Sequence, residues 1–409
     1  MDKSDIVIIG GGISGLSLAF YCARSGFRAL VLEKENRAGG CFHSHRIEDG
    51  DNRFWIELGA HTCYNSYRNL LDIIDECRIT GQMTGRARVP YRMYADNRIH
   101  SVFSRINYPE LLTSLPRLFF QEKTGHSVAS YYSRVVGEQN YRNTFRHFFN
   151  AVPSQEAGEF PADMLFKKRA RRKDVLKSFT FTGGLQTVTD AIAANKGIQV
   201  LTEKQADSVS LVNDHYCVVT KDGSQYEARY LAMATPAHVS ARLLQSVYPD
   251  LAQQLFTILP ARINTTGVIL KKMSVAHKPV AGIVSPDDLF YSIVSRDTVP
   301  DKNYRGFTFH FKPDIHDYAV RMKRIEEVLG VNSAQIEYSV LKLNLLPAPR
   351  LGHQQLVDGI DALLANRRLL LTGNYFAGIS IEDCVSRSLS EFSRLRLPDS
   401  EATAGRYNG

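Results

Sequence analysis

Three glycines and one carboxylate near the start of the chain are spaced as parts of a single binding turn. An apolar run at 6–9 is followed by Gly10, Gly12 and Gly15, and a second apolar run ends at Glu33. Gly10 permits a tight turn, Gly12 lets the backbone approach a pyrophosphate, and Gly15 lets a helix pack closely on a strand. Glu33 is placed to accept hydrogen bonds from ribose hydroxyls, and its charge disfavours a 2′-phosphorylated nucleotide. We predict that the turn binds a dinucleotide.

A strand, a turn and a helix must follow one another to position these residues. The pattern predicts a strand at 6–9, a helix from the glycine turn to about Ser25, and a second, parallel strand ending at Glu33. The N-terminus of such a helix carries free N–H groups and positive potential, so it faces the phosphates of a bound dinucleotide. Ser14 lies in the first turn of this helix and belongs to the predicted site.

A second pair of glycines follows the acidic residue. Arg37 precedes Gly39 and Gly40, and the segment FWIELGAH comes farther on, at 54–61. Bare glycine backbone permits another close approach to a ligand. This arrangement resembles the flavin amine oxidase and protoporphyrinogen oxidase superfamily, whose members have an arginine and paired glycines after the ribose-binding acid, then a Leu-Gly segment under the flavin. The resemblance implies FAD contacts at Arg37, Gly39, Gly40, Leu58 and Gly59.

The resemblance extends over nearly the whole chain. Four further segments match motifs of the superfamily in the right order, at 181–191, 230–236, 346–353 and 371–384. The last of these, LTGNYFAGISIEDC, is similar to the protoporphyrinogen oxidase-like branch. The resemblance implies an α/β fold with FAD as cofactor. Its FAD-binding domain would be Rossmann-type, like that of p-hydroxybenzoate hydroxylase.

We expect the chain to interleave its domains. Segments 1–62, 178–245 and 354–409 are assigned to the FAD-binding domain. Segment 63–177 has apolar residues at helical spacing and is expected to form a helical cap. Segment 246–353 mixes strand-like runs with one helical stretch and is expected to form the sheet of a substrate domain. The substrate cavity would then lie between these parts, over the flavin.

The C-terminal motif also has a physical interpretation. Its short apolar run predicts a buried strand, and Gly373 keeps the backbone bare beside Asn374. Ser380 is placed to cap a helix that begins near Ile381. The start of that helix would offer N–H groups to the flavin edge where reduced flavin carries negative charge. Gly373, Asn374 and Ile381 are therefore included in the predicted FAD site.

Two further positions follow from the resemblance. Ala206 begins a segment similar to one whose first residue holds adenine through its backbone, so alanine is acceptable there. Cys41 stands where the family usually has a second arginine. This departure either loosens pyrophosphate binding or is compensated by another cation such as Arg46.

Few side chains qualify for a role in catalysis, because the flavin carries the redox chemistry. His61 would either contact the ring or substrate or hydrogen-bond to backbone in a buried turn. Tyr375 would either form an aromatic wall of the substrate site or pack in the core. His43 and His45 lack a third ligand, so we expect no metal site. His353 more plausibly ends a strand or packs near the ring than titrates during catalysis.

Composition and charge indicate where the protein is located and which partners it could bind. The formal net charge is +8, six cysteines are scattered without a Cys-x-x-Cys pair, and no apolar run is long enough to cross a bilayer. With no signal peptide visible, we expect a cytoplasmic protein. The basic run at 167–173 is either a solvated face or a patch for anionic lipid or a carboxylated substrate, which leaves peripheral membrane contact open. Nucleic acid binding is least favoured, because no recognition module accompanies the run.

These observations favour an FAD-dependent oxidoreductase that oxidises C–H or N–H bonds of a small-molecule substrate by hydride transfer to flavin N5. It would be protoporphyrinogen oxidase-like or amine oxidase-like, with oxygen or another electron acceptor. One alternative is a carotenoid-type desaturase or a redox-neutral flavin isomerase, for which 111–120 could contribute a membrane-facing patch. The other alternative is a non-catalytic FAD-binding partner protein. Substrate identity and oligomeric state stay open.

Overall fold

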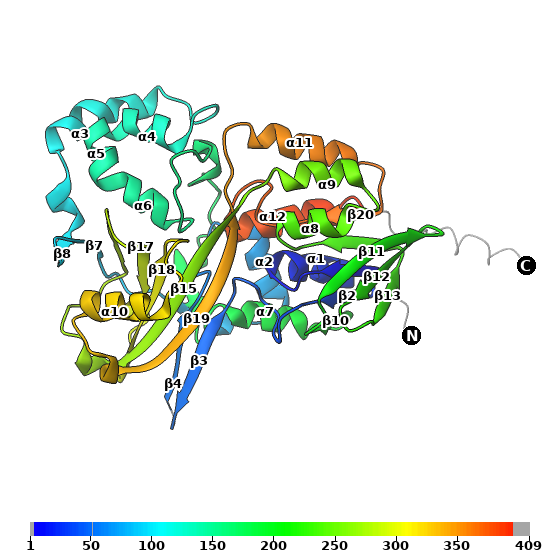
Figure 1. The fold of residues 1–409 in the computed structure, drawn as a ribbon, viewed down its shortest axis with the longest axis horizontal. Coiled ribbons are helices and arrows are strands. Elements are labelled where there is room, and N and C mark those ends of the chain that lie inside the picture. The colour runs from blue at the N-terminus through cyan, green and yellow to red at the C-terminus, as the bar shows by residue number, and fades with distance from the viewer. Residues whose placement is uncertain (1–3, 51, 396–409) are drawn as a thin grey trace, which may run out of the picture.

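A five-stranded parallel sheet lies at the centre of the part of the molecule that holds the first and last described residues (Figure 1). The computed structural model describes residues 4–50 and 52–395. The strands in spatial order are β10 (Ile198–Leu201), β2 (Ala29–Leu32), β1 (Ile6–Ile9), β14 (Tyr230–Met233) and β20 (Leu369–Leu371). The three segments expected to build the FAD-binding domain thus each contribute at least one strand. The domain boundaries themselves stay a prediction.

Helices cover both faces of this sheet, which explains why its strands are apolar throughout. Ile6 and Ile8 point to one face, and Val7 and Ile9 point to the other. The first face packs against α1 (Ile13–Arg24), α2 (Arg68–Glu76), α7 (Gln186–Ala193) and α12 (Ile381–Phe392). The second packs against α8 (Ala237–Leu244), α9 (Pro249–Phe256) and α11 (His353–Leu364), which lie above the sheet in Figure 1. This is the doubly wound α/β arrangement expected from the sequence.

A small antiparallel sheet adjoins the parallel one. It consists of β11 (Ala206–Val212), β12 (His215–Thr220) and β13 (Gln225–Ala228). Tyr216 and Val218 of β12 are buried in the same apolar cluster as Val7 and Ile9. The two sheets therefore share one core.

A seven-stranded sheet forms the second large layer, at the lower left of Figure 1. Its order is β19 (Ile336–Pro347), β15 (Pro260–Lys271), β18 (Tyr304–Phe311), β17 (Phe290–Ser295), β16 (Gly282–Val284), β7 (Tyr91–Ala95) and β8 (Arg98–Ser101). α10 (Tyr318–Leu329) packs on one face and ends at Gly330, whose φ of 65° is left-handed. Strands β7 and β8 come from 63–177, so the segment expected to form a helical cap also contributes strands: their hairpin extends the sheet through the parallel pairing of β7 with β16.

Apart from α2, the rest of 63–177 is mostly helical, and its residues between 111 and 165 form an apolar cluster of their own. It contains α3 (Tyr108–Ser114), α4 (Val128–Val136), α5 (Glu138–Asn140), a π-helical turn (Tyr141–Phe145) and α6 (Arg146–Ala151). A short sheet of β5 (Cys63–Tyr64), β9 (Ser178–Phe181) and β6 (Met83–Gly85) closes the segment. Among the described residues, no helix is long and apolar enough to span a membrane.

Single 3-10 turns join many of these elements. They are η1 (Thr80–Gln82), η2 (Val102–Arg105), η3 (Leu115–Phe119), η5 (Ala162–Met164), η6 (Lys272–Ser274), η7 (Arg296–Thr298) and η8 (Ser333–Gln335).

The hairpin of β3 (Ser44–Asp49) and β4 (Asn52–Glu57) connects the two large sheets. Phe54, Ile56 and Leu58 are buried with Ile269 and Tyr304 of the seven-stranded sheet. Glycines in β15 and β18 make this contact close, because a Cβ at Gly306 would lie 2.2 Å from an Ile56 methyl carbon. The segment after β4 is thereby held between the parallel sheet and the seven-stranded sheet.

Candidate functional site

The glycine turn between β1 and α1 contains glycines of two kinds. Gly10 has a φ of +108°, and a Cβ there would lie 2.6 Å from the Ala234 carbonyl oxygen. A Cβ at Gly15 would lie 2.0 Å from the Gly10 carbonyl oxygen. Both glycines are therefore required by the protein itself. By contrast, a Cβ at Gly12 would have only the Gly40 Cα within 4 Å, at 3.9 Å, so the bare backbone of Gly12 faces open space. A dinucleotide pyrophosphate would fill that space.

The N-terminus of α1 is left without a side-chain cap. Gly12 is the N-cap residue, no side chain of the N-cap accepts from the first turn, and the first turn has no acidic residue. Ser14 is buried in this turn. Uncapped amides and the positive end of the helix dipole form a ready site for phosphate. The N-terminus of α1 is therefore suited to the pyrophosphate of FAD, the cofactor that the sequence predicts.

Glu33 lies where β2 ends, beside the turn. Its Oε2 accepts a hydrogen bond from the Gly11 amide at 2.7 Å, and its Oε1 accepts one from the Glu35 amide at 2.9 Å. The side chain is buried. Each oxygen has capacity for a second hydrogen bond, so the carboxylate can still accept from ribose hydroxyls.

Arg37 organises the second glycine pair. Its guanidinium donates to the carbonyl oxygens of Ala38 and Gly40, both at 2.9 Å, and of Phe42 at 3.1 Å. Burial lowers the pKa of this guanidinium from its ordinary value. Gly39 bridges to the turn, because its amide donates to the Gly11 carbonyl at 2.7 Å. The pair is thus fixed directly against the glycine turn, as the sequence predicts for two parts of one site.

A lysine from a distant strand lies beside Cys41. Lys342 of β19 donates to the Gly40 carbonyl at 2.6 Å, and burial lowers its pKa to about 8. Arg46 does not take this place: it donates to the Gly183 carbonyl at 2.9 Å and forms an ion pair with Asp190 at 3.2 Å. The cation near the departure at Cys41 is therefore Lys342 rather than the arginine suggested by the sequence.

The segment after β4 runs alongside 41–43. The Leu58 amide donates to the His43 carbonyl, and a Cβ at Gly59 would lie 2.3 Å from the Cys41 carbonyl oxygen. On its other side, the Leu58 carbonyl accepts from Asn344 of β19 at 2.8 Å. Leu58 and Gly59 therefore lie between the Arg37 loop and the seven-stranded sheet.

His61 has a partner that neither sequence interpretation included. Its Nε2 lies 3.0 Å from Nε2 of His310 in β18. The other ring nitrogen of His310 lies 3.1 Å from the Thr265 hydroxyl, which also accepts from Asn344 at 3.0 Å. Burial lowers the pKa of His310 to about 4 and that of His61 well below its ordinary value. Both rings are thus neutral at pH 7, and the N–H of one ring donates a hydrogen bond to the bare nitrogen of the other.

Glu57 is the acid of the same segment, and it is fully enclosed. Its carboxylate accepts from the Ser44 hydroxyl at 2.9 Å and from the Leu185 amide at 2.7 Å. Burial raises its pKa to about 7. Glu57 therefore ties the β3–β4 hairpin to the segment at 181–191.

The C-terminal motif folds locally as its residues predict. α12 begins at Ile381 with Ser380 as N-cap, and Ser380 and Asp383 form a reciprocal capping box. Gly373 and half-exposed Asn374 follow the buried strand β20. Their contacts with FAD stay a prediction.

Tyr375 is buried in the apolar cluster under α8 and α11, with its ring 4.6 Å from that of Phe376. The structure therefore matches the core alternative, and we do not propose Tyr375 as a wall of the substrate site. His353 is likewise internal: it begins α11 instead of ending a strand, and its Nε2 lies 2.6 Å from the Tyr375 carbonyl oxygen. Ala206 is buried at the start of β11, and its predicted contact with adenine would be made by its backbone.

Much of the basic run at 167–173 forms ion pairs within the chain. Lys167 and Arg169 pair with Asp383 at 3.2 and 2.7 Å, and Arg172 pairs with Asp75 and Asp174. These contacts tie the cap segment to α12 and α2. No cluster of metal-ligating side chains occurs in 4–50 and 52–395.

Comparison with known proteins identifies the family. The family model for flavin containing amine oxidoreductases matches residues 13–265. The chain belongs to this family. It is thus a member of a family of FAD-dependent oxidoreductases, which confirms the resemblance stated from the sequence and FAD as the cofactor that the family implies.

Individual relatives are distant. The chain is 23% identical to protoporphyrinogen oxidase of Bos taurus, over 95% of this chain and 98% of the relative. It is 21% identical to a probable flavin-containing monoamine oxidase A of Dictyostelium discoideum, over 67% of this chain and 66% of the relative. Several curated relatives, plant phytoene desaturases among them, are matched over less than two thirds of their own length. Cyclohexylamine oxidase from Brevibacterium oxydans superposes with a TM-score of 0.69 at 15% identity, over 96% of this chain and 98% of that one, which shows the fold alone.

Four residues of the site were not identified from the sequence: Thr265, His310, Lys342 and Asn344. All of them lie on the face of the seven-stranded sheet that meets the Leu58 segment. One signal was present in β19. Leu341 and Leu343 are 48% and 47% exposed, whereas Lys342 and Asn344 face inward. Polar residues on the inner face of an alternating strand indicate a site.

Proposed function

We propose that the chain oxidises a C–H or N–H bond of a small organic substrate that binds between the Leu58–His61 segment and the seven-stranded sheet. Family membership supports the reaction class. The observation that carries the proposal is the N-terminus of α1, which has no side-chain cap and whose N-cap residue, Gly12, presents bare backbone to open space. FAD supplies hydride acceptance at its ring when it is bound.

The chain's own residues bind, orient and exclude water. The α1 amides and Lys342 offer positive potential to the pyrophosphate, and Glu33 accepts from ribose. His61 and His310 are both neutral, so one N–H···N hydrogen bond joins them and they add no charge to the site. A substrate polar group at His61 would therefore meet a ring that His310 already orients, and Thr265 holds His310 in turn.

Reconstitution with FAD tests the site. We expect stoichiometric binding with a flavin absorption spectrum, and we expect Gly12→Asp to abolish it, because the carboxylate would occupy the pyrophosphate position. Gly81→Asp is the matched control, since Gly81 has no neighbour within 4 Å. Absence of a flavin spectrum in the wild type, or retained FAD in Gly12→Asp, would refute the proposal.

Anaerobic mixing with a substrate panel tests the reaction. Protoporphyrinogen, coproporphyrinogen, primary and secondary amines, and polyenes are added to the FAD-loaded protein, and bleaching of the flavin is recorded. We expect bleaching by a porphyrinogen or by an amine. If no porphyrinogen bleaches the flavin, the protoporphyrinogen oxidase-like assignment fails. If no member of the panel does so, the redox-neutral isomerase and the non-catalytic FAD-binding protein are the alternatives that stay open, and conversion of an unsaturated substrate without bleaching separates them.

One observation favours the desaturase or isomerase alternative. Phe103, Leu112, Phe119 and Phe120 of the cap segment are all at least 70% exposed. An apolar surface of this kind would suit a substrate delivered from a membrane. This alternative predicts that polyenes or unsaturated fatty acids are converted while amines and porphyrinogens are not. An isomerase would do so without net reduction of the flavin.

A further inference from the structure

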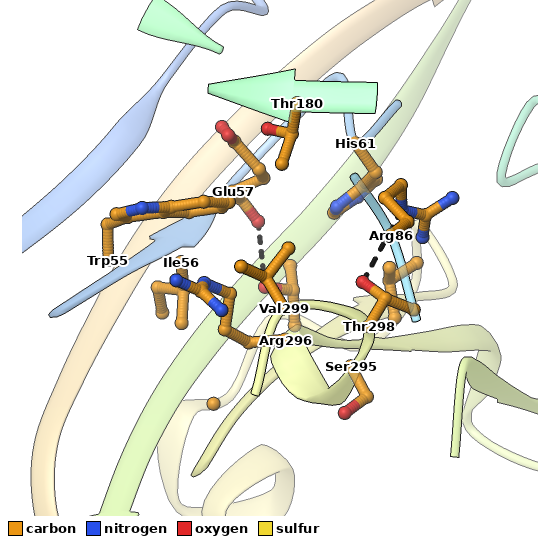
Figure 2. Close-up of a pocket in the computed structure, with 13 residues that line it drawn as sticks. Trp55, Ile56, Glu57, His61, Arg86, Thr180, Ser295, Arg296, Thr298 and Val299 are labelled. Atoms are coloured by element: carbon orange, nitrogen blue, oxygen red, sulfur yellow. Dashed lines mark hydrogen bonds between the residues drawn. The ribbon is translucent and has the colours of Figure 1, made fainter. Parts of the chain in front are cut away.

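A small cavity lies beside the Leu58–His61 segment, between β4 and the turn η7. Figure 2 shows Trp55 with Arg296 beneath it on one side, and His61 and Arg86 on the other. The cavity leaves about 20 Å³ for the centres of water-sized groups, which is room for a water molecule or a small polar head group. Two guanidinium groups therefore line a space too small for a whole substrate.

Arg296 has hydrogen-bonding capacity that the chain does not use. Its Nε and Nη1 are buried and have no partner, and its guanidinium carbon lies 4.0 Å from the centre of the Trp55 ring. Stacking on the indole satisfies the face of the guanidinium but leaves its edge N–H groups free. Burying a charged donor without an acceptor costs free energy, so this edge requires a group from outside the chain.

Three carboxylates lie near Arg296, and among the described residues none of them pairs with it. Asp301 accepts hydrogen bonds from two backbone amides of its own loop. Glu57 directs its oxygens to Ser44 and Leu185. Asp297 is held by Arg305, with both carboxylate oxygens accepting from its guanidinium. In the part of the chain that the structure describes, Arg296 therefore has no ion-pair partner.

A second unpartnered group lines the same cavity. Thr180 of β9 is 1% exposed, and its hydroxyl has no hydrogen-bond partner. Arg86 donates weakly to the Thr298 hydroxyl at 3.4 Å and adds a second positive charge. Buried donors and two cations in one small space favour an anion, and the planar edge of a guanidinium matches a carboxylate.

We propose that the cavity between Trp55 and Arg296 is a subsite for a carboxylate group of the substrate. His61 lies both in this cavity and in the segment predicted under the flavin, so a carboxylate bound here anchors the substrate next to the ring. This assignment of substrate class rests on the proposed function: the substrate is an organic acid whose carboxylate lies remote from the bond that is oxidised.

Trp55 provides a direct measurement, because it is the single tryptophan of the chain. FAD-loaded protein is titrated with sodium propionate at constant ionic strength, and tryptophan emission is recorded. Propionamide, which has the same shape without the charge, is titrated in parallel. We expect a saturable change with propionate and none with propionamide. An equal response to propionamide, or a response to phosphate or chloride but not to propionate, would overturn the proposal.

Variants of the cavity residues test whether the change in tryptophan emission comes from propionate bound at Arg296. Arg296→Gln should weaken propionate binding by about ten- to a hundredfold, since a hydrogen bond to a charged group is lost. Arg88→Gln removes an exposed guanidinium nearby and should leave the dissociation constant unchanged. Because Arg296→Gln could disturb folding, Thr180→Val is tested as well; this near-isosteric change should weaken binding by several-fold. Unchanged affinity in both Arg296→Gln and Thr180→Val would overturn the subsite.

The two proposals fail separately. Flavin absorbance reports whether FAD is bound, and Trp55 emission reports whether the carboxylate is bound. A flavin spectrum without a propionate response overturns the subsite and leaves the oxidoreductase proposal intact. A propionate response in protein that takes up no FAD supports the anion site but overturns the proposed function, and with it the substrate assignment.

Discussion

The buried carboxyl of Glu57 makes stability depend on pH in a defined direction. Its pKa is about 7 in the folded chain, against about 4.5 when exposed. The folded state therefore binds the proton more tightly between these values, so this group's contribution to stability is full below about pH 4.5 and is lost as pH rises through about 7. A shift of this size corresponds to about 3 kcal/mol at most.

Glu57→Gln tests this contribution. Glutamine cannot ionise, so the free energy of unfolding lost by the variant relative to wild type should shrink by about 2–3 kcal/mol between about pH 5 and about pH 8. Urea unfolding at both pH values measures it. Glu48→Gln, an exposed carboxyl on the same hairpin, should show no such trend. A difference between wild type and Glu57→Gln that does not vary with pH would contradict the raised pKa.

The amino group of Lys342, a base rather than an acid like Glu57, should make FAD binding depend on pH. Burial lowers its pKa to about 8, so its positive charge beside Gly40 is lost as pH rises through that value. FAD is anionic, and we expect its dissociation constant to rise about fivefold from about pH 7 to about pH 9, as for loss of one half-exposed charge. Lys342→Met should bind more weakly at about pH 7 and lose this dependence. Equal pH profiles for the two proteins would place Lys342 outside the FAD site.

At the scale of elements, the close packing of α1 on β1 depends on Gly15. A Cβ there would lie 2.0 Å from the Gly10 carbonyl oxygen and 3.1 Å from the Ala234 side chain. Because the first contact is with backbone, Gly15→Ala must displace the helix, and we expect a loss of about 1–3 kcal/mol in unfolding free energy together with weaker FAD binding. Gly81→Ala, where a Cβ meets nothing within 4 Å, is the control. Wild-type stability and FAD affinity in Gly15→Ala would contradict this account.

The sequence was most informative where local pattern decides structure. The strand–turn–helix at 6–24, the buried strand at 369–371 and the Ser380 cap of α12 all follow from residues close together in the chain. The glycine turn between two apolar runs also predicted that β1 and β2 are parallel, as they are. Each of these elements is specified by its own residues, so a single sequence is enough.

Long-range pairing limited the prediction. The β7–β8 hairpin joins the seven-stranded sheet through β16, which is almost two hundred residues away in the sequence. The hairpin begins with an exposed tyrosine, and no residue near it in the sequence indicates that pairing. The partner of His61 is 249 positions distant, and the acceptor for Lys342 is 302 positions distant. Such contacts depend on sheet register, which apolar periodicity alone does not specify. The inward polar residues of β19 were the available clue.

At the scale of the whole molecule, charge and apolar surface are separated. Three residues of the basic run are used inside the chain, so it is less available to an outside partner than its composition suggests. Several of the most exposed apolar side chains gather instead on η2, α3 and η3, around the helix α3 at the upper left of Figure 1 and away from the parallel sheet. Arg117 and Arg134 line a hollow next to Phe120. Apolar side chains bordered by arginines form a surface suited to an anionic membrane.

We therefore expect the protein to co-sediment with vesicles that contain phosphatidylserine, and less with neutral vesicles or at high salt. Phe119 and Phe120 are 84% and 88% exposed, so replacing both by serine should reduce the bound fraction about tenfold or more without loss of stability. Met273→Ser is the control, because Met273 is 93% exposed on a different part of the chain. Wild-type protein that stays in the supernatant would exclude membrane contact, and a double variant that still sediments would assign it to another surface.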